Sequence, residues 1–198
     1  MWAPMTIFTE LWGIPYLNQV YHMSEVASNA HMAIIWIAVA IFSPLVGIFS
    51  QLCSKRLLPM RITALIGLLG AVVLLFAPGV FHSVPGWLIW VGLFCFGVGP
   101  TGAILSFAVV KDYNRENLGA AIGFNNMMVV LGGAFFQPLV GVLINMFWDF
   151  KAVGEDPVYT LSNYQIGLSI VPLCFFAGFI ISLFFLKETN CEQVILKK

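Results

Sequence analysis

The chain contains few charged residues. Charged side chains make up 9% of its 198 residues, whereas hydrophobic residues make up 60%. A soluble domain carries about 25% charged residues, so this composition excludes an ordinary soluble domain. The net charge is zero, which leaves no electrostatic attraction for nucleic acid. The sequence has no CxxC pair and no cluster of histidine and cysteine, so we expect neither a metal site nor a cofactor.

Six long apolar stretches fill most of the chain. A helix that crosses the ~30 Å hydrocarbon core of a bilayer needs about 20 mostly apolar residues, and it must satisfy its own backbone hydrogen bonds. We therefore predict one all-α transmembrane bundle, followed by a polar, disordered tail over 187–198. Its six helices are expected near residues 3–22, 31–51, 62–80, 86–110, 118–146 and 165–186.

The basic residues predict the orientation of this bundle. With six helices, eight of the nine basic residues fall on one side of the membrane: Lys55, Arg56, Arg61, Lys111, Arg115, Lys187, Lys197 and Lys198. Only Lys151 falls on the other side. The positive-inside rule places the first group, and with it both termini, in the cytoplasm. The compact loops favour a bacterial protein and hence an inner-membrane location.

A four-residue motif, Pro-Leu-Val-Gly, occurs twice in the chain. The first copy, Pro44–Gly47, lies late in the second predicted helix, and the second, Pro138–Gly141, lies late in the fifth. This spacing indicates two groups of three helices, about 1–80 and 86–186, the second inverted in the membrane because each group has an odd number of spans. Inverted three-helix repeats are typical of secondary transporters. The alternative is a chance match of four common membrane residues.

Two segments resemble a known family. Gly47–Arg56, with the sequence GIFSQLCSKR, resembles the basic loop motif of the major facilitator superfamily, although Gln51 and Leu52 replace its usual acidic and basic residues. Gly123–Gly141 resembles helix eleven of prokaryotic organic-solute and amino-acid carriers in that superfamily. The resemblance implies that the chain corresponds to the C-terminal six helices of a twelve-helix carrier.

The resemblance also implies a function. In this superfamily two six-helix halves tilt around a central site, so the chain would be one half of a secondary carrier and not an enzyme. We expect it to transport a small polar solute, an amino acid or an organic anion, as a proton symporter. A complementary half would come from the same longer chain, a separate chain or a second copy. The alternatives are a truncated, non-transporting membrane protein, an assembly partner, or a six-helix protein of another family.

Glu10 is the only acidic residue inside a predicted span. A carboxylate in hydrocarbon is costly, so Glu10 should face the bundle interior, a cavity or a partner. This makes it a candidate for carrying a coupled proton. Pro15 follows in the same helix and should kink it, because proline lacks a backbone N–H. The alternative is that the helix begins later and that Glu10 lies at the membrane interface.

Amide side chains form a second polar group. Asn126 and Gln137 are eleven residues apart, about three helical turns, and so share one helix face. Such amides can bind a polar solute or hydrogen-bond neighbouring helices. The complete set predicted for the solute and proton path is Glu10, Trp12, Tyr16, Asn18, Asn125, Asn126 and Gln137.

Glycines, prolines and two cations are predicted to govern helix bends and gating. Glycine permits close helix approach, and proline bends a helix. The predicted set is Gly13, Pro15, Gly47, Lys55, Arg56, Gly99, Pro100, Gly132, Gly133, Pro138 and Gly141.

Overall fold

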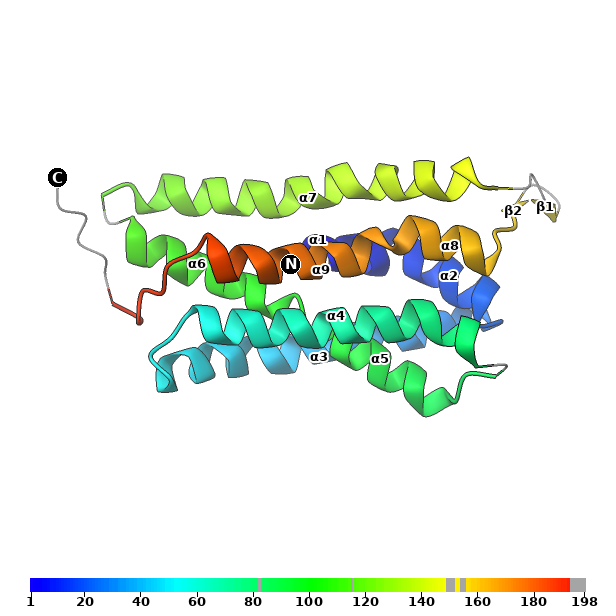
Figure 1. The fold of residues 1–198 in the computed structure, drawn as a ribbon, viewed down its shortest axis with the longest axis horizontal. Coiled ribbons are helices and arrows are strands. Elements are labelled where there is room, and N and C mark those ends of the chain that lie inside the picture. Colours follow the sequence, from blue (N-terminus) through cyan, green and yellow to red (C-terminus); the bar gives the residue numbers. More distant parts are fainter. Residues whose placement is uncertain (82, 115, 149–151, 154–155, 193–198) are drawn as a thin grey trace.

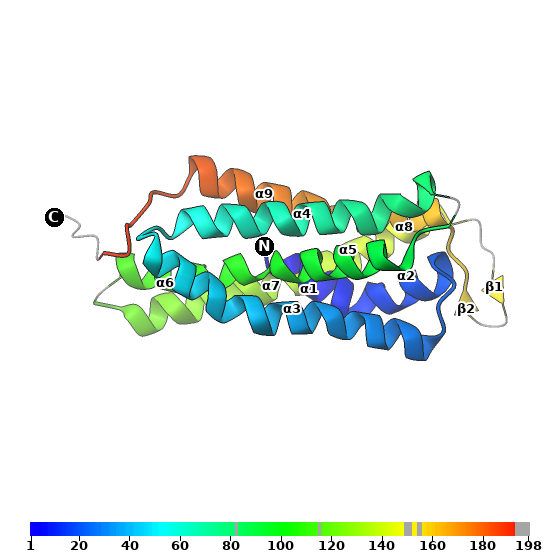
Figure 2. The same cartoon turned by 90° about the horizontal axis from the view of Figure 1, so that it is seen from below.

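The computed structural model describes all residues except 82, 115, 149–151, 154–155 and 193–198. The chain forms a bundle of long helices that run side by side (Figures 1 and 2). The first helix has three parts: α1 (Ala3–Ile7), the π-helical turn η1 (Phe8–Trp12) and α2 (Gly13–Val20). The elements that follow are α3 (Glu25–Leu52), α4 (Leu57–Val80), α5 (Gly86–Val98), α6 (Thr101–Tyr113), α7 (Leu118–Met146), β1 (Ala152–Val153), β2 (Asp156–Pro157), α8 (Leu161–Leu168) and α9 (Ile170–Phe184).

Most of the helical runs have the length and apolar character of membrane spans. Among the described residues, five such runs are Glu25–Leu52, Leu57–Val80, Gly86–Tyr113, Leu118–Met146 and Leu161–Phe184. The divided first helix makes a sixth, shorter run. The predicted all-α membrane bundle is therefore confirmed, with the two-residue strands β1 and β2 as a small antiparallel pair in the loop before α8.

Three helical runs begin earlier than their apolar stretches suggested, at Glu25, Leu57 and Leu161. The α3 helix starts at Glu25, because the Ser24 side chain accepts a hydrogen bond from the Ala27 N–H and caps the free end of the helix. The α4 helix starts at Leu57 and so includes Arg61. The Arg61 guanidinium is accommodated by two bonds, of 3.2 and 2.6 Å, to the carbonyl oxygen of Ser182 on α9.

Loops that carry basic residues gather at one end of the bundle (Figures 1 and 2). The α3–α4 loop carries Lys55 and Arg56, the last turn of α6 carries Lys111, and Lys187 follows α9. Arg61 lies on α4, and the remaining four basic residues, Arg115, Lys151, Lys197 and Lys198, lie outside the described residues.

A proline in α4 explains how the first helix is attached to the core. Pro78 has no N–H, so it leaves the carbonyl of Leu74 without its helical partner. The hydroxyls of Tyr16 and Tyr21 donate to this oxygen at 2.6 and 2.8 Å. Gln165 of α8 donates to the next carbonyl, that of Leu75, at 3.0 Å. Because unpaired polar groups are costly in an apolar medium, these bonds hold α2 and α8 against α4.

Most helices contribute to the main core, and one of its close packings lies where α4, α5 and α9 cross. A Cβ on Gly67 of α4 would come within 2.6 Å of the Gly99 Cα, so the two backbones meet without side chains between them. Gly99 and Pro100, both buried, separate α5 from α6. The ring of Phe175 from α9 packs against both glycines. The interruption at Gly99–Pro100 therefore lies at a close crossing of these helices.

The α7 helix is the least buried of the long helices. It lies along one edge of the bundle (Figure 1). Its buried residues are Gly133, Val140 and Ile144 alone among those described. Large apolar side chains on its other sides, such as Phe124 and Phe135, are exposed. This helix therefore presents a broad surface that the rest of the described chain does not cover.

Candidate functional site

Glu10 lies on the π-helical turn η1 and is exposed on the surface of the bundle. The Gly13 N–H bonds to the carbonyl of Phe8, five residues earlier, and this wider turn adds one residue to the helix. Pro15 follows closely, and its ring would clash with the carbonyl of Leu11 in a regular helix. The bend expected at Pro15 is thus accompanied by a π-turn, a feature that often occurs at functional sites.

Gln137 of α7 lies next to Glu10. Its Nε2 donates to the carbonyl oxygen of Thr6 at 2.9 Å and lies 3.5 Å from Glu10 Oε2. The backbone carbonyl of Gln137 accepts a bond of 3.3 Å from the Trp12 indole N–H. We call Thr6, Glu10, Trp12 and Gln137 the Glu10 site. It brings together three predicted path residues from two helices that are far apart in sequence.

Glycines of α7 allow the first helix to approach this closely. A Cβ on Gly133 would lie 2.7 Å from Thr6 Oγ1, and one on Gly141 would lie 3.2 Å from the Trp12 ring. A Cβ on Gly132 would lie 3.2 Å from that of Ala3. These α7 glycines therefore fix the distance between the two helices. Pro138, between them, is exposed.

Three other predicted path residues have partners inside the bundle. Tyr16 is fully buried, and its hydroxyl binds the Leu74 carbonyl. Asn18 accepts a hydrogen bond from the Ser28 hydroxyl of α3. Asn125 donates to Ser106 Oγ of α6 at 3.0 Å. These contacts correspond to the structural alternative, in which polar groups join neighbouring helices.

Asn126 differs from its neighbour Asn125 because it is exposed on α7.

Two glycines of the predicted bend set differ in their surroundings. A Cβ on Gly13 would clash with the backbone carbonyl oxygen of Phe8, so the π-turn leaves no room for a side chain at this position. A Cβ on Gly47 would have no neighbour within 4 Å. Packing within the described bundle therefore gives no reason for glycine at position 47.

A charged network closes one end of the bundle. Arg56 Nε lies 3.1 Å from Asp112 Oδ2, and the Arg56 Nη1 donates to Ser50 Oγ at 3.2 Å. The same Asp112 oxygen accepts a bond of 2.8 Å from the Thr189 hydroxyl. Asp112 is only 7% exposed. The network joins the end of α3, the start of α4, the end of α6 and the segment after α9.

Glu188 completes this network by capping α4. Its two carboxylate oxygens accept bonds from the backbone N–H groups of Arg56, at 2.6 Å, and Leu57, at 3.0 Å. The first N–H groups of a helix lack helical partners and attract negative charge. We call Arg56, Asp112 and Glu188, with their contacts, the charged end.

The charged end corrects two expectations. The prediction of a disordered tail is wrong for Lys187–Glu192, because Glu188 and Thr189 bond to α4 and α6; residues 193–198 lie outside the described part. Of the predicted gating pair, only Arg56 enters the network through its side chain. Lys55 is exposed and contributes its carbonyl oxygen, which accepts a bond of 2.9 Å from Ser50.

Residues 5–192 match the sequence model of the Major Facilitator Superfamily. The chain belongs to this superfamily. It is therefore a multi-pass integral membrane protein that takes part in the transport of a solute across the membrane. Members of the Major Facilitator Superfamily are generally transporters and not enzymes. No curated protein and no solved structure gives a significant match to the chain.

The two clusters of this Major Facilitator Superfamily protein differ in chemistry. The Glu10 site offers a carboxylate, an amide and an indole, and Glu10 has no ion-pair partner in the described part of the chain. At the charged end, by contrast, Asp112 forms an ion pair with Arg56, and Glu188 caps the start of α4. Sequence reasoning missed Asp112 and Glu188, because their partners lie 56 and 132 residues away. The only sequence signal was their location beside predicted helix ends.

Proposed function

We propose that this chain is one half of a secondary carrier and that the Glu10 site binds the transported solute and a coupled proton. The observation that supports this most is the position of Glu10, a carboxylate on a π-turn of a membrane helix, 3.5 Å from the Gln137 amide and without a cationic partner among the described residues. A carboxylate in a membrane helix is costly and is usually kept for function. Proton uptake by Glu10 would remove that charge during transport.

Within the classes expected from the sequence, the site favours an amino acid over an organic anion. Before it takes up the proton, the Glu10 carboxylate would attract the ammonium group of an amino acid, whereas it would repel the carboxylate of an organic anion. Gln137 and Trp12 add an amide and an indole edge for further contacts. Groups that bind the carboxylate of the solute would come from the complementary half.

The need for a complementary half is supported by α7. Its exposed surface includes the polar Asn126 as well as large apolar side chains. An amide that faces lipid lacks a hydrogen-bond partner, so a second protein surface there would lower the free energy of the bundle. This half would belong to the same longer chain, to a separate chain or to a second copy. A truncated protein without transport is the alternative, and uptake measured with and without the partner half separates the two.

The charged end would act as the gate on the cytoplasmic side. Opening it requires the Arg56–Asp112 pair to separate and Glu188 to leave the start of α4. The basic loops at this end support a cytoplasmic orientation for it and for both termini, by the positive-inside rule. The compact loops suggest a bacterial inner membrane.

The test of this proposal is uptake by the complete carrier that carries Glu10→Gln. A panel of labelled amino acids and small carboxylates is offered to cells under an inward proton gradient. We expect proton-driven uptake to be abolished at an unchanged level of carrier in the membrane. Glu25→Gln is the matched control, because Glu25 is exposed in the first turn of α3. Wild-type uptake by the Glu10→Gln carrier would rule out the proposed role.

A further inference from the structure

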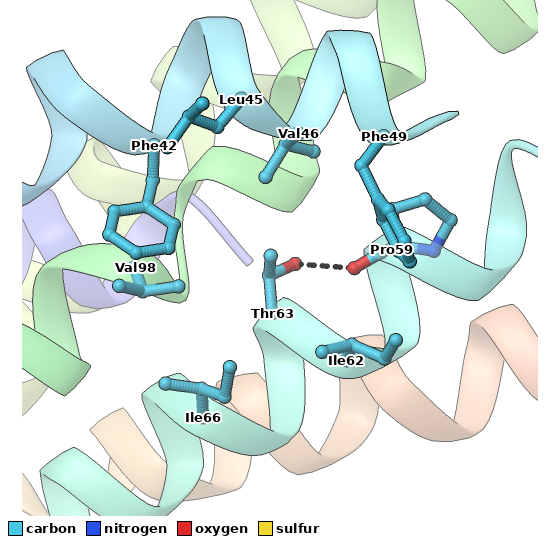
Figure 3. A pocket seen from close by; sticks show the side chains of 9 residues that line it. All are labelled: Phe42, Leu45, Val46, Phe49, Pro59, Ile62, Thr63, Ile66 and Val98. Atoms are coloured by element: carbon cyan, nitrogen blue, oxygen red, sulfur yellow. Dashed lines mark hydrogen bonds between the residues drawn. The ribbon is translucent and has the colours of Figure 1, made fainter. Parts of the chain in front are cut away.

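An apolar groove lies between α3 and α4, near the charged end (Figure 3). Its volume is about 140 Å³. Each helix contributes four residues with the i, i+3, i+4, i+7 spacing of a single helix face, and a residue of α5 completes the lining. These residues are Phe42, Leu45, Val46 and Phe49 of α3, Pro59, Ile62, Thr63 and Ile66 of α4, and Val98.

The groove offers no free polar group to a ligand. Its one hydroxyl, that of Thr63, donates to the carbonyl oxygen of Pro59 at 3.0 Å (Figure 3) and lies 3.1 Å from that of Met60 in the same helix. A water molecule in a cavity needs two or more polar partners, and a polar solute needs similar ones. The chemistry of the lining therefore selects an apolar chain.

The groove opens toward the surface of two membrane-spanning helices. Leu45, Phe49 and Ile62, which line it, are 47%, 40% and 39% exposed. Since α3 and α4 both have the length and apolar character of membrane spans, this surface is suited to contact with the hydrocarbon chains of the bilayer. An acyl chain can therefore enter the groove from the side.

One cation near the groove remains available for a lipid headgroup. The loop between α3 and α4 contains Lys55, which is exposed and whose ammonium has no hydrogen-bond or ion-pair partner among the described residues. The two arginines nearby are engaged, Arg56 by Asp112 and Arg61 by the Ser182 carbonyl. Basic residues next to a span attract anionic headgroups.

We propose that this groove binds one acyl chain of an anionic phospholipid, whose phosphate pairs with Lys55. The apolar lining would hold the chain, and the exposed cation would select the headgroup. The proposal concerns the lipid-facing side of α3 and α4, and it does not depend on which solute the Glu10 site binds.

The test uses the complete native carrier in bilayers that contain a photoreactive diazirine lipid. One set of bilayers carries the label on phosphatidylglycerol and the other on phosphatidylcholine, and adducts are mapped by peptide mass spectrometry. We expect the adducts to be concentrated on residues 42–49 and 59–66. Phosphatidylglycerol should give about fivefold more of them than phosphatidylcholine, because one lysine near an anionic headgroup contributes about 1 kcal/mol. Lys55→Gln should remove this headgroup preference and leave the adducts of phosphatidylcholine unchanged.

Two further variants separate a bound lipid from the general lipid layer. Leu45→Trp places a larger side chain at the mouth of the groove and should reduce its adducts by more than half. Leu69→Trp is the matched control, because Leu69 is 64% exposed on α4 outside the groove; it should not alter them. Equal labelling of the groove and of the surface around Leu69 would overturn the proposal. The absence of lipid adducts from the groove, because a protein segment fills it, would also overturn the proposal. A headgroup preference that survives Lys55→Gln would overturn it as well.

Discussion

Glu10 and Gln137 meet across the first helix and α7, with 3.5 Å between Glu10 Oε2 and Gln137 Nε2. The same amide donates to the Thr6 carbonyl at 2.9 Å, so its orientation is fixed by the backbone of the helix that carries Glu10. A shift of α7 along the first helix would change the surroundings of the carboxylate. Movement of this helix pair and binding at Glu10 are therefore expected to be coupled.

Replacing Gln137 with leucine should impair transport more than folding. The variant removes the amide beside Glu10 and its bond to the Thr6 carbonyl. A hydrogen bond that the solute can no longer make at this amide is worth about 1 kcal/mol, so we expect uptake to fall about fivefold. A hydrogen bond between membrane helices contributes only about 0.6 kcal/mol, so the melting temperature in detergent should fall by a few degrees at most. Gln51→Leu, at an exposed position near the end of α3, is the control and should retain uptake.

The tyrosine pair at Leu74 should show a non-additive effect on stability. Tyr16→Phe and Tyr21→Phe each leave the Leu74 carbonyl with one hydroxyl partner, whereas the double variant leaves it with none. We expect each single change to cost about 1 kcal/mol or less and the double change to cost more than the sum. Thermal unfolding of the four proteins measures this difference.

Pro78 provides a second test of the same explanation. Pro78→Ala restores an N–H that can bond to the Leu74 carbonyl within α4. In that background, the double change of Tyr16 and Tyr21 to phenylalanine should cost less than it does in the wild type. An equal cost in both backgrounds would show that the tyrosine hydroxyls do not replace a helical bond.

Close approach of α1 to α7 should depend on Gly133. In Gly133→Ala the new methyl would lie 2.7 Å from Thr6 Oγ1, so the two helices must separate or Thr6 must rotate. Overpacking of this kind costs about 1–3 kcal/mol, and the Gln137 bond to Thr6 should weaken with it. Gly119→Ala introduces the same methyl where no atom lies within 4 Å. Gly133→Ala should lower both the melting temperature and the uptake, and Gly119→Ala should leave both unchanged.

At the charged end, replacing both Arg56 and Asp112 should cost less stability than replacing either one alone. Arg56→Gln leaves Asp112, which is almost completely buried, without its cation, and Asp112→Asn leaves Arg56 without its anion. Breaking a buried pair on one side costs about 3–5 kcal/mol, and the partial exposure of Arg56 at 14% places our expectation at the lower end. The double variant should be more stable than either single variant. A loss equal to the sum of the two single losses would contradict a direct pairing of these groups.

The sequence predicted the helices well because the thickness of the bilayer determines how long an apolar run must be. It identified Glu10 and Gln137 separately, since each is a polar residue in an apolar helix. Their contact could not be predicted, because it depends on the π-turn at Phe8–Trp12 and on the glycines of α7. The roles of Asp112 and Glu188 were missed for a similar reason, since a carboxylate at a helix end is recognised only when its distant partner is known.

The central claim is that the Glu10 site couples solute movement to proton movement. Its most direct test is the internal pH of proteoliposomes that contain the complete carrier, monitored with a trapped fluorescent dye. Addition of a transported amino acid outside should acidify the interior with wild-type carrier. With Glu10→Gln it should cause no acidification, although the purified variant keeps the wild-type melting temperature. Acidification at the wild-type rate by the Glu10→Gln carrier would contradict the claim.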